Sequence, residues 1–233
     1  MPVAKGSSPD PTECYFCGEA LSESNPATKS HVIPRRWFGT PPLPDLPTLP
    51  AHEACNRALG PPEERIRNAL VRMFSHDPTA HSAVFKKAIR SRQQRPREIY
   101  AGYYKTPGGG LFVPSRMIEL PESEDVEAVF RGVTRGLFYK LVERLMPQEV
   151  PVRSVFLQER HATPVSERLF KLARGALALG NEFSFKPLMR EDNPHDGFWL
   201  YLVFNAGIVA SFTGDSANLQ FPPARLAYGH PVP

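Results

Sequence analysis

Three cysteines and one histidine of this 233-residue chain are spaced like metal ligands. Cys14-x-x-Cys17 places two thiols on one tight turn, and His52-x-x-Cys55 repeats that spacing further along the chain. Together they offer three sulfurs and one nitrogen, the donor set of a closed tetrahedral zinc site. Zinc in such a site contributes about 10–16 kcal/mol to the folding of a small module. The alternative is three buried free cysteines and a surface histidine; an odd number of cysteines argues against a disulfide framework.

A second histidine lies between the two half-sites, in the motif KSHVIPRR. His31 is not needed for the zinc site, and the apolar, β-branched residues after it are typical of a short strand. Histidine has an unperturbed pKa of about 6.5, so it can take a proton from water near neutral pH. Arg35 and Arg36 follow closely, and guanidinium groups bind phosphate well. The alternative is an ordinary histidine at the end of a strand.

The order Cys-x-x-Cys, His-Val-Ile-Pro, His-x-x-Cys-Asn resembles the HNH endonuclease superfamily in its zinc-stapled ββα-metal form, over about residues 13–66. The resemblance implies a zinc-held hairpin packed on a helix, and hydrolysis of phosphodiester bonds with His31 as the general base. It also implies that Asn56 takes part in catalysis as a ligand of a divalent metal, Mg²⁺ or Mn²⁺. An acidic pair after "CN" is similar to a bacterial subgroup, which makes Glu63 and Glu64 further candidate ligands of that metal.

Two features of the chain favour a second function. Many members of the superfamily carry an acidic metal ligand directly before the base histidine, where this chain has Ser30. The middle asparagine that gives the family its name also has no counterpart here. The alternative to a nuclease is therefore a zinc-stabilised module that binds nucleic acid without cleaving it. A zinc-folded interaction protein without a nucleic-acid partner is the third interpretation.

Charge is unevenly distributed along the chain. Residues 1–118 carry 16 Lys and Arg against 10 Asp and Glu, a net +6, whereas residues 119–233 carry 12 against 14, a net −2. The N-terminal half is therefore the expected partner of a polyanion. For the nuclease that the resemblance implies, DNA is the expected substrate and RNA the less favoured one. The basic segment 86–97 is either a patch for the DNA backbone or a solvated helix face. Its candidate backbone contacts are Lys86, Lys87, Arg90 and Arg92.

The expected fold class is α+β, with a small zinc-bound ββα-metal module followed by helices and a mixed α+β C-terminal region. The predicted organisation is a disordered tail at 1–12, the zinc-stapled module at 13–75, a basic helix and hairpin at 76–118, and an α+β domain at 119–233. The proline-rich segment 41–50 is interpreted as an extended spacer between the two halves of the site, with an SH3-type ligand as the alternative.

Apolar periodicity predicts the individual elements. We expect helices at 62–75, 78–93, 123–146 and 165–180, a hairpin within 97–120, and strands at 152–158, 183–187, 197–204 and 207–213. Pro61 and Pro62 suit the start of the first of these helices, and Gly180 suits the end of the last.

Nothing in the sequence indicates a membrane partner. The chain begins without the apolar segment of a signal peptide, and its longest uncharged run, 198–212, is too short for a membrane helix. We therefore expect a soluble cytoplasmic protein. Cutting both strands of a duplex would favour a homodimer, although no feature of the sequence indicates one.

Overall fold

The computed structural model describes residues 12–38, 43, 45–73, 102–105, 112–115, 123–159, 171, 177–180, 182–204 and 207–218. The predicted disordered tail, apart from Thr12, and the predicted basic helix at 78–93 lie outside these residues. Within the described ranges the chain is a mixture of helices and antiparallel strands, as predicted. None of the described helices is long and apolar enough to cross a membrane.

The N-terminal unit is a hairpin followed directly by a helix. Strand β1 (Ala27–His31) pairs antiparallel with β2 (Thr48–His52), and α1 (Glu53–Met73) begins at the next residue. A short 3₁₀ turn, η1 (Arg35–Trp37), follows β1. The register places Ala27 opposite His52 and His31 opposite Thr48. His52 therefore lies where the hairpin meets the helix, and His31 lies at the hairpin's other end.

Helix α1 begins well before the predicted position. Pro61 and Pro62 were expected at its start, but they lie inside it. Each proline removes one backbone donor from the helix, so propensity alone favours the later start. Tertiary contacts of residues before and after the prolines stabilise the longer helix instead. Asn56 is hydrogen-bonded to β1 before them, and the Trp37 indole N–H donates to the main-chain oxygen of Glu63 after them.

The C-terminal half is a five-stranded antiparallel sheet with α3 (Ser123–Val142) packed against it. The sheet order is β5-β9-β8-β7-β6. The strands are β5 (Val152–Glu159), β6 (Leu177–Leu179), β7 (Phe183–Met189), β8 (Gly197–Val203) and β9 (Gly207–Thr213). The predicted helix that begins at 123 and the four predicted strands are confirmed, with small differences at their ends.

Strand β6 contradicts the end of the helix predicted at 165–180. Residues 177–179 pair with residues 183–185 of β7. The alternation Leu-Ala-Leu suits an edge strand as well as it suits a helix, so pairing with β7 decides the outcome. Gly180, at φ +64°, provides the left-handed turn between the two strands. Apart from Lys171, the rest of the predicted helix lies outside the described residues.

A separate two-stranded hairpin is confirmed where the sequence predicted one. Strand β3 (Gly102–Lys105) pairs antiparallel with β4 (Phe112–Ser115). The Gly-rich turn predicted between them lies outside the described residues.

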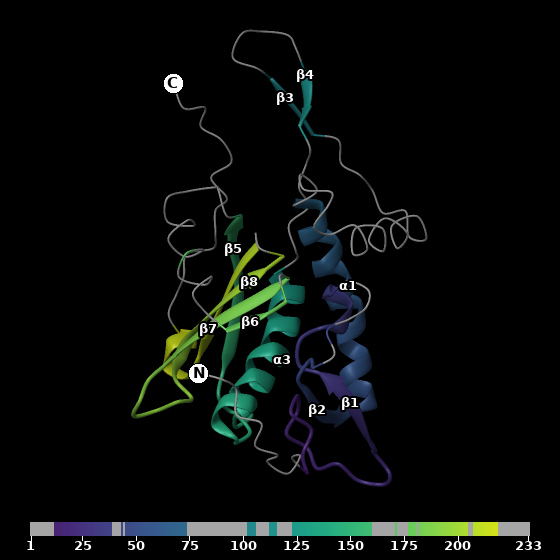
Figure 1. The fold of residues 1–233 in the computed structure, drawn as a ribbon, viewed down its shortest axis with the longest axis vertical. Helices are drawn as coiled ribbons and strands as arrows, with labels where there is room; N and C mark the ends of the chain where they lie inside the picture. Colours follow the sequence, from purple (N-terminus) through teal and green to yellow (C-terminus); the bar gives the residue numbers. More distant parts are fainter. Residues whose placement is uncertain are drawn as a thin grey trace.

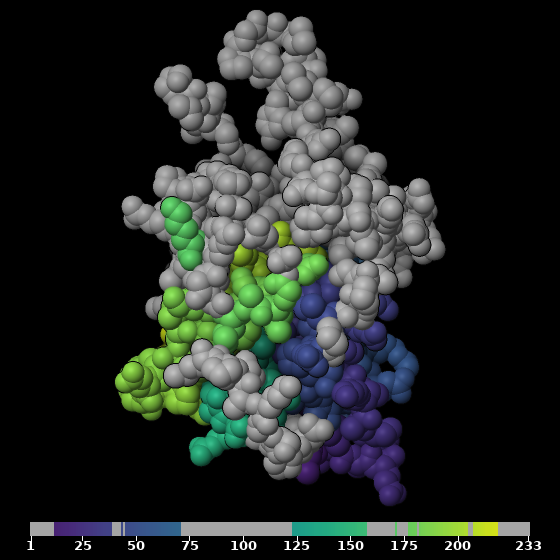
Figure 2. Space-filling view, viewed as in Figure 1, coloured from purple at the N-terminus to yellow at the C-terminus, as the bar shows by residue number. Residues whose placement is uncertain are grey.

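The N-terminal unit and the C-terminal half share one hydrophobic core. Trp37 of η1 is fully buried, with its ring centroid 5.7 Å from that of Phe130 in α3 and 6.3 Å from that of Phe183 in β7. Figure 1 shows α3 lying between the sheet and α1. Figure 2 shows the purple and blue N-terminal residues directly against the green residues of the C-terminal half. The position of the N-terminal unit is thus set by a core that it does not build alone.

Two glycines of α3 let the N-terminal unit approach the helix closely. A Cβ atom at Gly132 would lie 2.5 Å from the ring of Phe16, which belongs to the cysteine loop. A Cβ atom at Gly136 would lie 2.6 Å from Cγ1 of Val32, the residue that follows β1. Val32 is 2% exposed, so it has little room to move. The side chain of any other residue at these positions would push the cysteine loop or the end of β1 off the helix.

We predict that Gly136→Ala destabilises the protein. The new methyl group would meet both Cγ atoms of Val32, at 2.6 and 2.8 Å, and overpacking of this kind costs about 1–3 kcal/mol. That cost exceeds the gain of up to about 1 kcal/mol from replacing a helical glycine. Urea unfolding measures the difference. Arg131→Ala on the same helix, at a half-exposed side chain, is the control and should change stability by about 0.5 kcal/mol or less. A Gly136→Ala protein as stable as the wild type would contradict this packing.

Candidate metal centre and adjoining pocket

The four predicted ligands come together in one cluster. Cys14 and Cys17 flank a tight turn, His52 ends β2, and Cys55 lies in the first turn of α1. Their candidate ligand atoms all lie within 4.8 Å of one another. The turn is closed by a hydrogen bond from the Gly18 N–H to the Cys14 carbonyl, at 2.8 Å. The cluster can therefore hold a metal ion, as the spacing predicted.

Hydrogen bonding orients the imidazole of His52 for this role. Its Nε2 lies 3.2 Å from the main-chain oxygen of Ala20, and its Nδ1 lies 3.4 Å from Sγ of Cys17. A carbonyl oxygen can only accept, so Nε2 carries the proton and donates it. The lone pair is then on Nδ1, which faces the cluster. Fixing the tautomer of a ligand histidine through its second nitrogen is typical of metal sites.

The thiol pKa values also fit a site that binds a cation. Burial opposes ionisation of Cys14, yet the N–H groups of Cys17, His52 and Phe16 more than offset it and lower the pKa of Cys14 below 9.0. Burial, followed by the charge of Cys14, raises the pKa of Cys55 to about 12, and burial is also the main cause that raises the pKa of Cys17. In the absence of a cation, ionisation of Cys14 is therefore favoured, whereas ionisation of Cys17 and Cys55 is opposed. A dication would remove this opposition.

A cavity of about 300 Å³ lies between the end of β1, η1 and the first turns of α1. Asn56 lines it and directly follows the ligand Cys55. The cavity brings together five residues that the sequence singled out: His31, Arg35, Arg36, Asn56 and Glu63. Its lining is completed by Pro34, Arg57 and Gly60. Arg57 pairs with Glu53 of the same helix, so Arg35 and Arg36 supply the excess positive charge beside Glu63 and make this a cationic pocket, suited to an anionic ligand.

A chain of hydrogen bonds holds the amide of Asn56 in one orientation. The Ser30 hydroxyl donates to Asn56 Oδ1 at 3.0 Å, and Asn56 Nδ2 donates to Thr28 Oγ1 at 3.4 Å. Thr28 in turn donates to the main-chain oxygen of Ala51. The Ser30 hydroxyl has one proton, which it donates to Asn56. The Tyr15 hydroxyl, 3.2 Å from Ser30 Oγ, is therefore the donor in the hydrogen bond between them. The position before His31 thus orients Asn56 and offers the pocket no free ligand.

His31 is a half-buried side chain in a cationic environment. Burial is the main cause that lowers its pKa below 6.5, followed by the charges of Arg35 and Lys29. The imidazole is consequently neutral at neutral pH, which is the form that accepts a proton. This state suits a general base.

The two acidic residues predicted as metal ligands differ in placement. Glu63 lines the cavity, where burial, only partly opposed by the charge of Arg36, raises its pKa to about 7. Glu64 does not line the cavity, and its carboxylate lies 3.9 Å from the buried guanidinium of Arg67. Of the pair, only Glu63 is therefore placed to meet a ligand beside His31. The basic residues Lys86, Lys87, Arg90 and Arg92 lie outside the described residues.

Sequence reasoning missed three contributors to this pocket. Arg57 and Gly60 were overlooked because Pro61 and Pro62 resemble a helix start, which put both residues outside the predicted helix. Ser30 was judged only as a poor metal ligand, because its partner Asn56 lies far along the chain. No local signal reveals them, because Gly-Pro-Pro itself disfavours a continuous helix through these positions.

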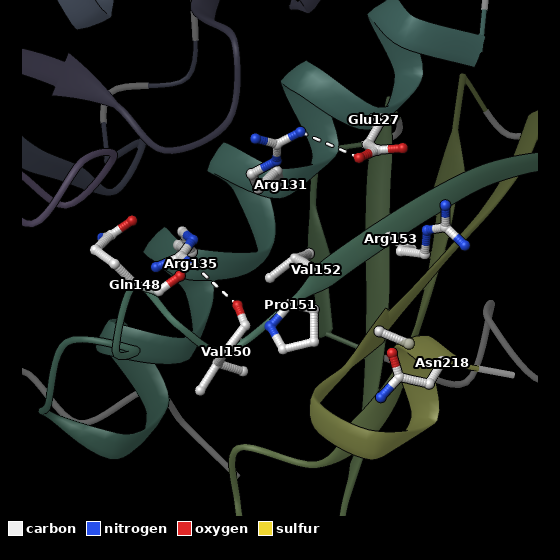
Figure 3. A pocket seen from close by; sticks show the side chains of 10 residues that line it. Glu127, Arg131, Arg135, Gln148, Val150, Pro151, Val152, Arg153 and Asn218 are labelled. Atoms are coloured by element: carbon white, nitrogen blue, oxygen red, sulfur yellow. Dashed lines mark hydrogen bonds and ion pairs between the residues drawn. The ribbon is translucent and has the colours of Figure 1, made fainter.

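A second cavity, of about 310 Å³, lies between α3, the start of β5 and the 3₁₀ turn η2 (Gly214–Asn218), as Figure 3 shows. It is lined by three arginines, but two of them are already paired. Arg135 donates to the main-chain oxygens of Met146 and Val150, at 2.9 and 3.1 Å, and Arg131 pairs with Glu127 at 3.1 Å. Arg135 therefore clamps the turn after α3, and we assign this cavity a structural role.

Comparison with known proteins gave no match. No protein-family model matches the chain, and no curated protein or solved structure matches it. The likeness to the HNH superfamily thus rests on motif order alone. Function must be inferred from the residues of this chain and their geometry.

We predict that His52→Ala abolishes metal binding, whereas His31→Ala preserves it. Both variants remove one imidazole from the N-terminal unit, but only His52 belongs to the cluster. Metal content of the purified proteins, and the thiolate-to-metal absorption of the cobalt-substituted forms, measure the difference. Equal metal content in the two variants would show that the cluster is not the binding site.

We also predict that NMR titration gives the His31 imidazole a pKa below 6.5, which Arg35→Gln raises. Removing a neighbouring positive charge makes the protonated ring less unfavourable, so the shift must be upward. Arg153→Gln, an exposed site on β5 outside this cavity, is the control and should leave the value unchanged. A His31 pKa that responds equally to both changes would contradict the placement of Arg35 beside it.

Proposed function

We propose that this chain is a metal-dependent HNH-type endonuclease that hydrolyses DNA phosphodiester bonds, with RNA as the less favoured substrate. The observation that carries the proposal is the cationic cavity beside the Cys₃His cluster. It gathers a half-buried histidine, an oriented asparagine and a half-buried carboxyl group, His31, Asn56 and Glu63. A base, candidate ligands for a hard cation and arginines for phosphate are the groups that this reaction requires.

The fold of the N-terminal unit supports the same conclusion. The resemblance to the HNH superfamily implied a hairpin packed on a helix and joined to it by a metal, and β1, β2 and α1 have that arrangement around the cluster. We propose zinc as the metal of the cluster. Three thiolates and one imidazole are the donor set that zinc takes in closed, structural sites.

We propose that Asn56 and Glu63 would hold a second, catalytic divalent ion, Mg²⁺ or Mn²⁺. Amide and carboxylate oxygens are the ligands that such hard cations prefer. A bound cation would supply positive charge for the phosphate and for the departing 3′ oxygen. Because the pKa of Glu63 is about 7, its carboxyl group is partly protonated at neutral pH, and binding an ion there would release that proton. Glu64, paired near Arg67, is the weaker candidate.

We assign the remaining steps of the reaction to other side chains that line the cavity. His31 would accept the proton of the attacking water, and its lowered pKa keeps it in the accepting form at neutral pH. Arg35 and Arg36, both exposed on η1, would hold the phosphate in line with that water. The basic residues singled out in the sequence, Lys86, Lys87, Arg90 and Arg92, would add contacts to the DNA backbone that weaken with salt.

One observation favours the alternative, a zinc-stabilised module that binds nucleic acid without cutting it. The Ser30 hydroxyl is committed to Asn56, so the position that carries an acidic ligand in many superfamily members supplies none here. Such a module would keep the cationic cavity and the salt-dependent binding. It would show no metal-dependent turnover.

The test is cleavage of supercoiled plasmid by the zinc-loaded protein with Mg²⁺, Mn²⁺ or EDTA. We predict nicking that requires the added metal and falls about 10²–10⁴-fold in His31→Ala, because that change removes the general base. Glu63→Gln should weaken the response to added metal while zinc content stays constant. Arg153→Gln, prepared in the same way, is the control for contaminating nucleases and for non-specific loss of charge.

Each outcome of this experiment has a defined meaning. Nicking that survives in His31→Ala would refute the assigned base. Salt-dependent DNA binding without nicking by the wild type would replace the nuclease with the binding module. Neither binding nor cleavage of DNA or RNA would refute both nucleic-acid functions.

A further inference from the structure

Gly60 is the residue of the cavity that no structural requirement explains. It lies inside α1 and lines the pocket together with His31, Asn56 and Glu63. A Cβ atom built at Gly60 would have no atom within 4 Å outside its own helix and chain neighbours. The position therefore faces open space, on the side of α1 that bears the functional residues.

The other glycines make the contrast clear. Among the glycines whose surroundings the structure describes, every one except Gly60 would place a Cβ atom within 3.0 Å of another atom. At those positions a side chain would meet a neighbouring atom, and three of the glycines also have a positive φ. Gly60 has neither reason, although glycine inside a helix costs about 1 kcal/mol relative to alanine.

The following proline does not account for Gly60 either. A residue before proline is disfavoured in the helical region because its Cβ atom meets the proline ring. However, Pro61 itself precedes Pro62, carries a Cβ atom and is helical. Helix α1 therefore accommodates a Cβ atom on a residue that precedes a proline, at position 61. With packing, a positive φ and the proline set aside, the remaining explanation is that the cavity requires a position without a side chain.

We propose that Gly60 is a specificity-determining residue, whose bare backbone forms the wall against which the sugar-phosphate backbone of a polynucleotide lies. Arg35 and Arg36 line the same cavity and would bind the phosphate charge. A volume of about 300 Å³ is at the small end for ligand pockets, so a branched side chain at position 60 would take up a substantial part of it. This inference rests on the proposed function, because it assigns the substrate contact of the same site.

The test is a graded series, Gly60→Ala and Gly60→Leu, measured by plasmid nicking and by fluorescence anisotropy with a labelled DNA duplex. We expect cleavage efficiency and DNA affinity to fall with side-chain size, and by roughly 100-fold in efficiency for Gly60→Leu, because displaced substrate reacts poorly. Zinc content should match the wild type, since a Cβ atom at position 60 meets no atom within 4 Å outside its own helix and chain neighbours.

A second pair of variants removes the effect of the proline. Pro61→Ala restores the helix N–H and ends the restriction on position 60, and Gly60→Leu combined with Pro61→Ala places the side chain on that relaxed helix. The double variant should lose DNA binding and cleavage, whereas Pro61→Ala alone should keep them.

The possible failures can be told apart. Gly60→Leu with intact zinc and wild-type cleavage and affinity would overturn the role of Gly60. Lost cleavage together with lost zinc in the double variant would also overturn it, because the effect would then be structural. If the wild type binds DNA without cutting it, only the nuclease function is refuted. The DNA affinities of the Gly60 variants then test the role of Gly60. A wild type that neither binds nor cuts nucleic acid refutes the proposed function and this inference with it.

Discussion

Four side chains from two distant segments must converge on one point, and the rest of the N-terminal unit depends on that convergence. The ligand atoms of Cys14, Cys17, His52 and Cys55 lie within 4.8 Å of one another. This fixes where β2 ends and α1 begins. Asn56 then follows the last ligand directly and reaches across to Ser30 and Thr28 of β1. Val32, Ile33 and Leu49 of the same unit are buried in the shared core, so the cluster and the core together define the hairpin and the helix.

The second constraint is the close fit of this unit to α3. Two glycines leave room for Phe16 of the cysteine loop and for Val32 beside His31, and Trp37 extends the contact to the aromatic core of the sheet. The cluster orders the unit from within, and α3 supports it from outside. Both constraints hold the surface on which the cavity lies, so its shape is set by the end of β1, η1 and α1. A rigid frame of this kind is what positioning of a base and a phosphate requires.

How far the sequence predicts this structure depends on how local each feature is. The four ligands were predictable because their spacing is set by single turns of the chain. The strands from 183 onward were predictable because their apolar runs are bounded by turn residues. The start of α1 was not, because the prolines at 61 and 62 indicate a later start and tertiary contacts of Asn56 and Trp37 override them. Residues 177–179 were too few for periodicity to distinguish helix from strand. Ser30, Arg57 and Gly60 gain their roles only from the three-dimensional proximity of β1 and α1.

The most direct test of the central claim is anomalous diffraction from crystals of the zinc-loaded protein soaked in Mn²⁺. Zinc and manganese have different absorption edges, so the two ions can be located separately. We predict a zinc peak within the Cys₃His cluster and a manganese peak in the adjoining cavity at the carboxylate of Glu63, beside His31. A zinc peak with no manganese in that cavity, under conditions in which the protein cleaves DNA, would contradict the proposed catalytic site.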